Sequence, residues 1–197
     1  MSDLPFSQAC ENNKQPILEV LIRHLNDCCS VLEIGGGTGQ HAVYFAQHFV
    51  KTLWQSTDVP ANVDSLNLRI EQAQLENLPK AIALDVNQKP WPSVSADVLF
   101  TANSLHIMSA ESVESFFAEV GQHCKSKLLV YGPFKYDGEF TTESNAHFDL
   151  WLKDRDPRSG IRDFEWVNQL AGAAGFKLIE DNTMPANNQL LVWQAAE

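Results

Sequence analysis

The 197-residue sequence lacks the features of a membrane, secreted or zinc-binding protein. It has no run of ~18 apolar residues, which a membrane-spanning helix needs. The first residues, MSDLPF, have neither the basic segment nor the apolar run of a secretion signal. The four cysteines, Cys10, Cys28, Cys29 and Cys124, form no C-x-x-C pair and have no histidine nearby at zinc spacing. We therefore expect a cytoplasmic protein with reduced thiols, no metal and no membrane partner.

Basic residues are also scarce. The chain has 14 Lys and Arg against 25 Asp and Glu, which gives a formal net charge of −11, and it has no basic run. Affinity for nucleic acids comes mostly from basic side chains that neutralise phosphates, and an acidic protein repels polyanions. We therefore expect no nucleic-acid partner and favour a small-molecule substrate. No linker or repeat divides the sequence, so residues 1–197 are predicted to form one domain, with residues 1–16 as a lid segment.

Short β-branched runs alternate with helical patterns along the chain. Strands are expected at residues 30–34, 52–57, 81–84, 96–102, 127–131, 176–180 and 189–194, and helices at 16–26, 40–49, 62–75, 110–124, 144–153 and 163–174. Connections of helix length predict a parallel sheet covered on both faces. The last two strands are too close for a crossover, so the final one should run antiparallel. The predicted fold class is α/β, a doubly wound Rossmann-like sheet of about seven strands.

A glycine-rich segment, VLEIGGGTGQ at residues 31–40, follows from the first strand into a helix. Gly35, Gly37 and Gly39 allow a sharp turn and a close approach of a ligand to the backbone. Asp58 ends the second strand about 20 residues later, where a carboxylate can accept both hydroxyls of a ribose. These residues predict a nucleoside ligand at the carboxyl edge of the sheet. The alternatives are a glycine turn without a ligand and a helix-capping role for Asp58.

Glu33 distinguishes between two nucleoside cofactors. The string GTGQHA at residues 37–42 also fits the relaxed dinucleotide pattern, so NAD is the competing ligand. A carboxylate at Glu33 would repel a pyrophosphate but would favour the ammonium and sulfonium groups of S-adenosylmethionine. Asp85, followed by Val86, ends the third strand, where it can accept a hydrogen bond from the adenine amino group. The set therefore favours S-adenosylmethionine.

On these residues the sequence resembles class I S-adenosylmethionine-dependent methyltransferases, and more closely the methyltransferase-like protein 26 family, which has no well-defined substrate. The matching strings are NKQPIL at 13–18, EIGGGTGQHA at 33–42, ANSLHI at 102–107, YGPF at 131–134, GIRD at 160–163 and MPANN at 184–188. The resemblance implies the methyltransferase fold and S-adenosylmethionine as the cofactor.

The segment after the fourth strand should face the reacting centre. His106 has a suitable intrinsic pKa for a general base, and a structural histidine on a turn is the alternative. Asn103 is expected to contact the cofactor or to position the substrate. Because Ser104 follows Asn103, the Asn/Asp-Pro-Pro-aromatic motif of methyltransferases that act on adenine or glutamine amino groups is absent.

Further polar and aromatic side chains are expected near the same edge as candidates for substrate binding. They are Asn13, Lys14, Tyr131, Phe134, Arg162, Asp163, Asn187 and Asn188. Asn13 and Lys14 are expected to precede the first helix, on the lid. As alternatives, Arg162 and Asp163 can pair with each other or cap the next helix, and the two asparagines can turn a hairpin.

Three functions follow from this sequence. The first is a methyltransferase that uses S-adenosylmethionine on a small molecule. The second is a nicotinamide-dependent oxidoreductase. The third is a non-catalytic module that keeps a methyltransferase fold for cofactor binding or protein interaction.

Overall fold

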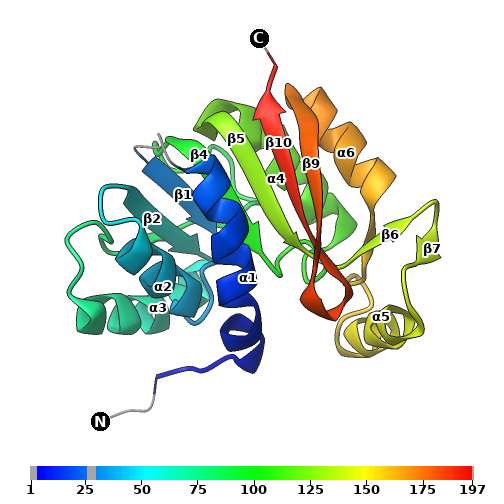
Figure 1. Ribbon diagram of the computed structural model, residues 1–197, viewed down its shortest axis with the longest axis horizontal. Helices are drawn as coiled ribbons and strands as arrows, with labels where there is room; N and C mark the ends of the chain where they lie inside the picture. Colours follow the sequence, from blue (N-terminus) through cyan, green and yellow to red (C-terminus); the bar gives the residue numbers. More distant parts are fainter. Residues whose placement is uncertain (1–3, 26–29, 197) are drawn as a thin grey trace.

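A seven-stranded mixed sheet forms the centre of the molecule, with strand order β3-β2-β1-β4-β5-β10-β9 (Figure 1). The computed structural model describes residues 4–25 and 30–196, so Cys28 and Cys29 lie outside the described residues. The strands are β1 (Ser30–Ile34), β2 (Leu53–Asp58), β3 (Ile82–Ala83), β4 (Ala96–Ala102), β5 (Cys124–Gly132), β9 (Phe176–Met184) and β10 (Asn188–Ala195). β10 runs antiparallel to both β5 and β9, while β1 is parallel to β2 and β4. The predicted doubly wound sheet with a reversed last strand is confirmed.

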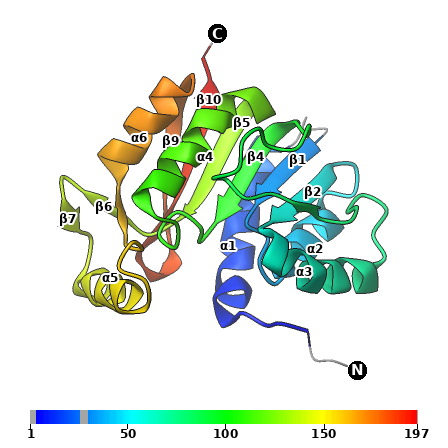
Figure 2. The same ribbon diagram turned by 180° about the vertical axis from the view of Figure 1, so that it is seen from behind.

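Helices cover both faces of this sheet, and each face has its own hydrophobic core. The helices are α1 (Gln8–His24), α2 (Gln40–His48), α3 (Pro60–Ala73), α4 (Ala110–His123), α5 (Glu143–Arg155) and α6 (Phe164–Ala173). α1, α2 and α3 pack on one face, and α4 and α6 pack on the other (Figures 1 and 2). In β4, Val98 and Phe100 point into the first core while Leu99 points into the second. This alternation is what a strand buried on both faces requires.

The first helix begins eight residues earlier than predicted, at Gln8 instead of residue 16. Ser7 is its N-cap, and the Ser7 hydroxyl accepts a hydrogen bond from the Cys10 backbone N–H at 3.4 Å. Asn13 and Lys14 therefore lie within the helix, and the expectation that they precede it is wrong. Pro16, at the expected start of the helix, lies inside α1, where it removes one backbone hydrogen-bond donor. Of the described residues, only residues 4–7 precede the helix. The expected helix end at residue 26 lies outside the described residues.

A second, three-stranded sheet was not predicted from the sequence. It consists of β6 (Phe134–Tyr136), β7 (Glu139–Phe140) and β8 (Arg162–Asp163), in the order β7-β6-β8. It connects the end of β5 to α5 and α6. The start of α1, α5 and the connection between β9 and β10 lie at the same end of the main sheet (Figure 1). This end is the carboxyl edge, where the sequence predicts the ligand.

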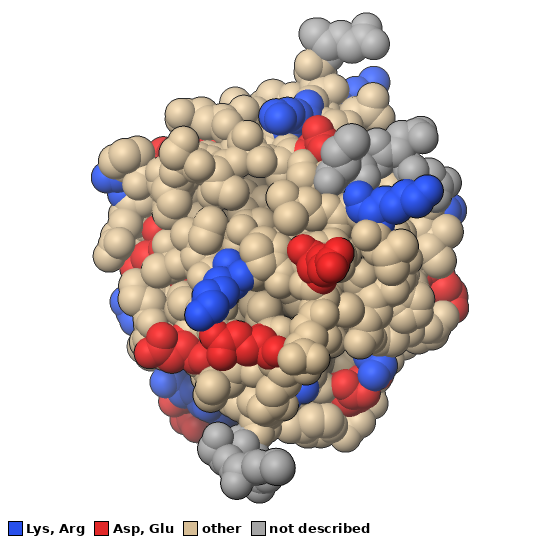
Figure 3. All heavy atoms as spheres, turned by 90° about the vertical axis from the view of Figure 1, so that its left-hand side faces the viewer, with Lys and Arg blue, Asp and Glu red and all other residues tan. Residues whose placement is uncertain are grey.

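The helices and the surface charges of the molecule bear on membrane and nucleic-acid partners. Within residues 4–25 and 30–196, no helix has both the length and the apolar content for a membrane crossing. On the face drawn in Figure 3, basic and acidic side chains are interspersed, and the basic ones do not merge into one patch. That face offers no continuous cationic track for a polyanion.

Candidate cofactor and acceptor site

The glycine segment forms a tight loop between β1 and α2. Gly35, Gly37 and Gly39 have φ angles of +76°, +55° and +76°, in the left-handed region that favours glycine. A Cβ at Gly35 would lie 2.7 Å from the Ser104 Oγ, and one at Gly39 would lie 2.8 Å from the Leu66 Cδ1, so both positions are closely packed. A Cβ at Gly37 would meet nothing within 4 Å among the described residues. The loop is therefore packed at its two ends and open at Gly37, as a backbone cradle for a ligand requires.

Asp58 lies directly beside this open position. Its Oδ2 accepts a hydrogen bond from the Gly37 N–H at 2.7 Å. Its Oδ1 accepts from the Val59 N–H at 2.7 Å and from the Asn62 side-chain amide at 2.9 Å. The carboxylate is thus held in one orientation at the end of β2. The predicted neighbours Gly37 and Asp58 are brought together, with the Asp58 carboxylate also ordering the start of α3.

Glu33 is buried beneath the glycine loop, with 2 % of its surface exposed. Its Oε2 accepts hydrogen bonds from the Ser56 hydroxyl at 2.7 Å and the Trp54 indole N–H at 3.1 Å. A Cβ at Gly36 would come within 3.5 Å of the same oxygen. Burial raises the pKa of Glu33 to about 6, against the opposing effect of the two hydrogen bonds. Near neutral pH, Glu33 is therefore a mostly ionised carboxylate held under the loop at an energetic cost.

Asp85 and Val86 form the turn after β3. The Asp85 Oδ1 accepts hydrogen bonds from the backbone N–H of Asn87 at 2.9 Å and from its side-chain amide at 3.1 Å. Val86 is buried, and its carbonyl accepts from the Trp91 indole N–H at 3.4 Å. This turn follows the strand next to β2, so its half-buried carboxylate lies at the same edge as Asp58.

The segment after β4 carries Asn103 and His106. Asn103 has a φ of +57°, and its backbone N–H donates to the Tyr131 carbonyl at 2.8 Å. His106 is 5 % exposed, and its ring meets the Phe148 ring of α5 edge-on at 5.5 Å between centroids. Among the described residues, no side chain or backbone group hydrogen-bonds to either His106 ring nitrogen. Burial, followed by the positive charge of Arg162, lowers the pKa of His106 to about 4. At neutral pH the imidazole is uncharged and can accept a proton.

Three of the predicted substrate residues come together beside this segment. Tyr131, at the end of β5, is buried, and burial raises the pKa of its hydroxyl. The side chains of Asn13 and Asn188 lie close to that hydroxyl and oppose this shift. Asn13 also contacts the His41 Nε2 through its Oδ1 at 2.6 Å. Residues from α1, β5 and β10 thus form one polar cluster of uncharged groups.

The other five candidates have contacts of a different kind. Phe134 is 1 % exposed and packs in the second core. Lys14 pairs with Glu11 and lies 4.9 Å from the centre of the Tyr44 ring. The Asn187 carbonyl accepts from the Asn145 side-chain amide at 3.0 Å, and its φ of +57° marks it as a turn residue. Asp163 is the N-cap residue of α6 and pairs with Lys135 at 3.2 Å, while Arg162 binds backbone carbonyls of the segment that carries His106.

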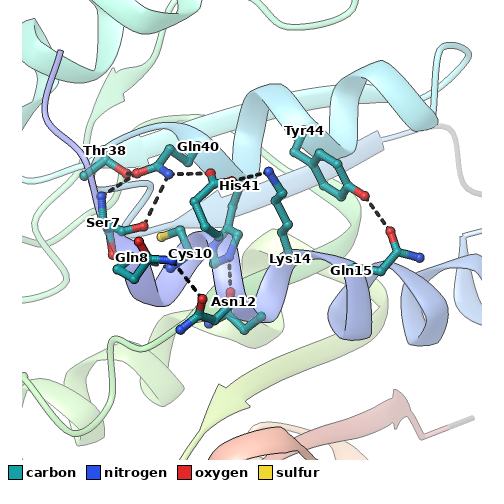
Figure 4. A network of polar contacts seen from close by, with 12 residues as sticks. Ser7, Gln8, Cys10, Asn12, Lys14, Gln15, Thr38, Gln40, His41 and Tyr44 are labelled. Carbon is teal, nitrogen blue, oxygen red and sulfur yellow. Dashed lines mark hydrogen bonds and ion pairs between the residues drawn. The ribbon is translucent and has the colours of Figure 1, made fainter. Parts of the chain in front are cut away.

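Sequence reasoning missed Gln40 and Arg69, which attach the residues before α1 to the glycine loop. The Gln40 Oε1 accepts from the Ser7 N–H at 2.6 Å and from the Thr38 hydroxyl at 3.0 Å, and its Nε2 donates to Glu11 at 2.6 Å (Figure 4). The Arg69 guanidinium donates to the carbonyls of Thr38 and Pro5. The chain before α1 is therefore bound to the tip of the loop. In the sequence, the only indication of these contacts is that Gln40 directly follows the last glycine of the loop.

A cavity of about 250 Å³ lies beside β8, α5 and the starts of α4 and α6. Its lining includes Lys135, Asp149, Lys153, Arg162, Asp163 and Trp166. Each charged group of this lining already has a partner: Lys153 pairs with Asp149 at 2.6 Å, Lys135 pairs with Asp163, and Arg162 binds carbonyls. Among the described residues, no group of three or more His, Cys, Asp or Glu side chains could hold a metal ion.

Several methyltransferases of known structure share this fold. An O-methyltransferase family protein from Burkholderia thailandensis matches with a TM-score of 0.78 and 18% identity, over 93% of this chain and 56% of that one. The apo S-adenosylmethionine-dependent methyltransferase SibL matches at 0.79 and 20%, over 95% and 56%. Human N-acetylserotonin methyltransferase, solved with SAM, matches at 0.75 and 16%, over 93% and 55%. The chain spans a little over half the length of these proteins.

At these identities the likeness defines the fold, which is that of the class I methyltransferases. The chain itself belongs to the DUF938 family, described as a protein of unknown function, whose model matches residues 4–195.

Proposed function

We propose that this protein is a cytoplasmic methyltransferase that uses S-adenosylmethionine and acts on a small molecule. The observation that carries the proposal is the open side of Gly37 next to the Asp58 carboxylate, a cradle with an acceptor for ribose hydroxyls. The methyltransferase fold of the neighbours supports it, and one neighbour was solved with SAM. The finer resemblance to the methyltransferase-like protein 26 family remains a prediction.

The residues of the loop fit this cofactor. S-adenosylmethionine supplies an electrophilic methyl group attached to a positively charged sulfur. In the proposed site, Glu33 provides a buried negative charge beneath the loop that favours a cationic ligand over a pyrophosphate. Asp58 binds the ribose and Asp85 with Val86 the adenine, while Asn103 contacts the cofactor near the reacting centre.

The acceptor side of the proposed site suits a hydroxyl substrate. His106 is uncharged at neutral pH and its ring nitrogens have no partner among the described residues, so a ring nitrogen can accept a hydrogen bond from a substrate hydroxyl. With a pKa of about 4 it is a weaker base than a free histidine, so it takes the proton as the hydroxyl becomes more acidic during methyl transfer. Asn13, Tyr131 and Asn188 form a neutral polar cluster that can orient such a substrate. O-methyltransferases among the neighbours support oxygen as the methylated atom. Contacts of the substrate with Lys14, Phe134, Arg162, Asp163 and Asn187 stay predictions.

Cofactor binding is the first expected result. A ligand that binds only the folded state at about 100 times its Kd adds about 2.7 kcal/mol to the free energy of unfolding, which raises Tm by about 5–10 °C. We expect this shift with S-adenosylmethionine and S-adenosylhomocysteine in thermal unfolding, and none with NAD(H). Protection by NAD(H) alone would instead support the nicotinamide-dependent oxidoreductase. No shift with any of them would contradict the proposal.

His106→Gln should separate chemistry from binding. Loss of a general base costs about 10²–10⁴-fold in rate, whereas S-adenosylmethionine affinity, measured by calorimetry, should stay within about twofold. Transfer is measured with methyl-labelled cofactor and a fractionated small-molecule extract. The matched control is His147→Gln on the exposed side of α5, which should keep full activity. Equal activity of the two variants would show that His106 takes no part in the reaction. If the wild-type protein bound the cofactor tightly but never transferred a methyl group, the non-catalytic module would be favoured.

A further inference from the structure

The turn that carries His106 is bound by a segment distant from it in the sequence, residues 159–162. The Ser159 hydroxyl donates to the Ile107 carbonyl at 2.8 Å, and the Gly160 N–H donates to the His106 carbonyl at 2.9 Å. The Arg162 Nε donates to the Leu105 carbonyl at 3.2 Å, and its terminal nitrogen donates to the Met108 carbonyl. Four consecutive carbonyls, from Leu105 to Met108, are thus each bound by residues 159–162.

The segment that makes these bonds is itself fixed by α5. Asp149 is 3 % exposed, and its Oδ1 accepts from the Ile161 N–H at 2.8 Å while its Oδ2 accepts from Lys153 at 2.6 Å. A Cβ at Gly160 would lie 3.0 Å from the same Oδ1, so the two elements are in close contact. α5 also supplies Phe148, whose ring packs against the His106 imidazole. The backbone and the ring of His106 are therefore both held from the α5 side.

The Arg162 guanidinium binds the backbone through its Nε and one of its terminal nitrogens. It donates to the carbonyls of Leu105 and Met108 and, at 2.9 Å, to that of Arg158. Hydrogen bonds from a charged donor are stronger than those between two neutral groups. Leu105 and Met108 bracket His106, so one planar side chain bridges both ends of the turn.

We propose that residues 159–162, and Arg162 in particular, are positioning residues that fix His106 at the acceptor site. The catalytic meaning of this inference rests on the proposed function. Arg162 acts through the backbone of the turn and needs no contact with the substrate. The GIRD string at residues 160–163, singled out by its resemblance to the methyltransferase family, thereby gains a physical role.

Hydrogen exchange in the intact protein tests this role. The amides of Ile107 and Met108 donate to the Ser104 carbonyl at 3.0 and 3.1 Å, so their exchange rates report opening of the turn. We expect Arg162→Met to raise both rates at least about tenfold, which corresponds to ~1.4 kcal/mol, with β4 unchanged. The matched control is Arg158→Met, an exposed arginine paired with Asp156 at 2.9 Å, which should leave the rates unchanged. Equal rates in both variants would overturn the proposal.

Titration of His106 supplies a readout that a merely structural role would not move. The charged group whose field reaches His106 is Arg162 of β8, and its other neighbours are Phe148 of α5 and Gly132 of β5. By NMR, the pKa of His106 should rise in Arg162→Met and stay unchanged in Arg158→Met. His41, whose pKa burial also lowers to about 4, is the internal reference and should not move. An unmoved His106 would contradict a coupling between the two residues.

Two further measurements keep the outcome decisive. If Arg162→Met fails to fold, Ser159→Ala replaces it, because this variant removes only the hydrogen bond to the Ile107 carbonyl. It should raise the exchange rates of the Ile107 and Met108 amides, and unchanged rates would overturn the proposal. S-adenosylhomocysteine affinity, measured by calorimetry, should stay within about twofold in both variants, because neither residue touches the glycine loop. Absence of binding to the wild-type protein would overturn the proposed function, while exchange and titration would still decide whether residues 159–162 hold His106.

Discussion

Asp58→Ala should abolish measurable binding of S-adenosylmethionine while the protein stays folded. The carboxylate has an oxygen beside the Gly37 N–H and is oriented by the Val59 N–H and Asn62. A pair of charge-assisted hydrogen bonds to the two ribose hydroxyls contributes about 3–4 kcal/mol, which is a loss of about 10²–10³-fold in affinity. Calorimetry with S-adenosylhomocysteine measures this directly.

The matched control for this substitution lies on α3, the helix that follows Asp58. Asp64→Ala removes an exposed carboxylate of α3 and should leave the affinity within about twofold of wild type. Asp58→Ala also frees the Gly37 N–H, so a modest decrease in Tm is expected alongside the loss of binding. If Asp58→Ala bound the cofactor as tightly as Asp64→Ala, Asp58 would only order the start of α3, and the cradle would lose its ribose acceptor.

The strands at the centre of the sheet were the most predictable part of the fold. Residues 30–34 and 96–102 form β1 and β4 with the expected bounds, because a strand buried on both faces reads as a mostly apolar run of β-branched and large residues. The expected start of the first helix at residue 16 differs from the observed start because the Ser7 hydroxyl caps the helix and Pro16 is accommodated inside it. β7 and β8 contain two residues each, too few for any periodicity to appear.

In the candidate site, too, some contacts could be predicted from the sequence and others could not. Topology alone predicts that Gly37 and Asp58 meet, since both follow parallel strands that are neighbours in the sheet. The contact of Arg162 with the Leu105 carbonyl joins residues 57 apart and depends on how the chain returns from α5. No local pattern encodes such a contact, so the sequence supplied the residue but not its partner.

Glu33 gives the second large effect, in which stability and cofactor affinity change in opposite directions. Its pKa is raised from 4.5 to about 6 in the folded protein, so the folded state holds the proton more tightly than the unfolded state. The associated cost is absent below pH 4.5, develops between pH 4.5 and 6, and above pH 6 amounts to about 2 kcal/mol. Glu33→Gln removes this cost and keeps an oxygen that can accept from Ser56 and Trp54. Denaturant unfolding at pH 8 should therefore show a more stable unliganded protein, with the gain disappearing near pH 4.5.

The same substitution should weaken S-adenosylmethionine binding about tenfold at pH 8, because the buried negative charge favours the cationic ligand. In the wild type, affinity should rise as the pH passes through about 6, where Glu33 ionises, whereas Glu33→Gln should show no rise there. Calorimetry at pH 5, 6.5 and 8 measures both curves. A variant that gains stability and binds the cofactor unchanged would assign Glu33 to the core alone. If Glu33 had only a structural role, its replacement by an uncharged residue would stabilise the protein without a loss of function. A gain in stability together with a loss of cofactor affinity in Glu33→Gln would therefore show that the ionised carboxylate is kept for ligand binding.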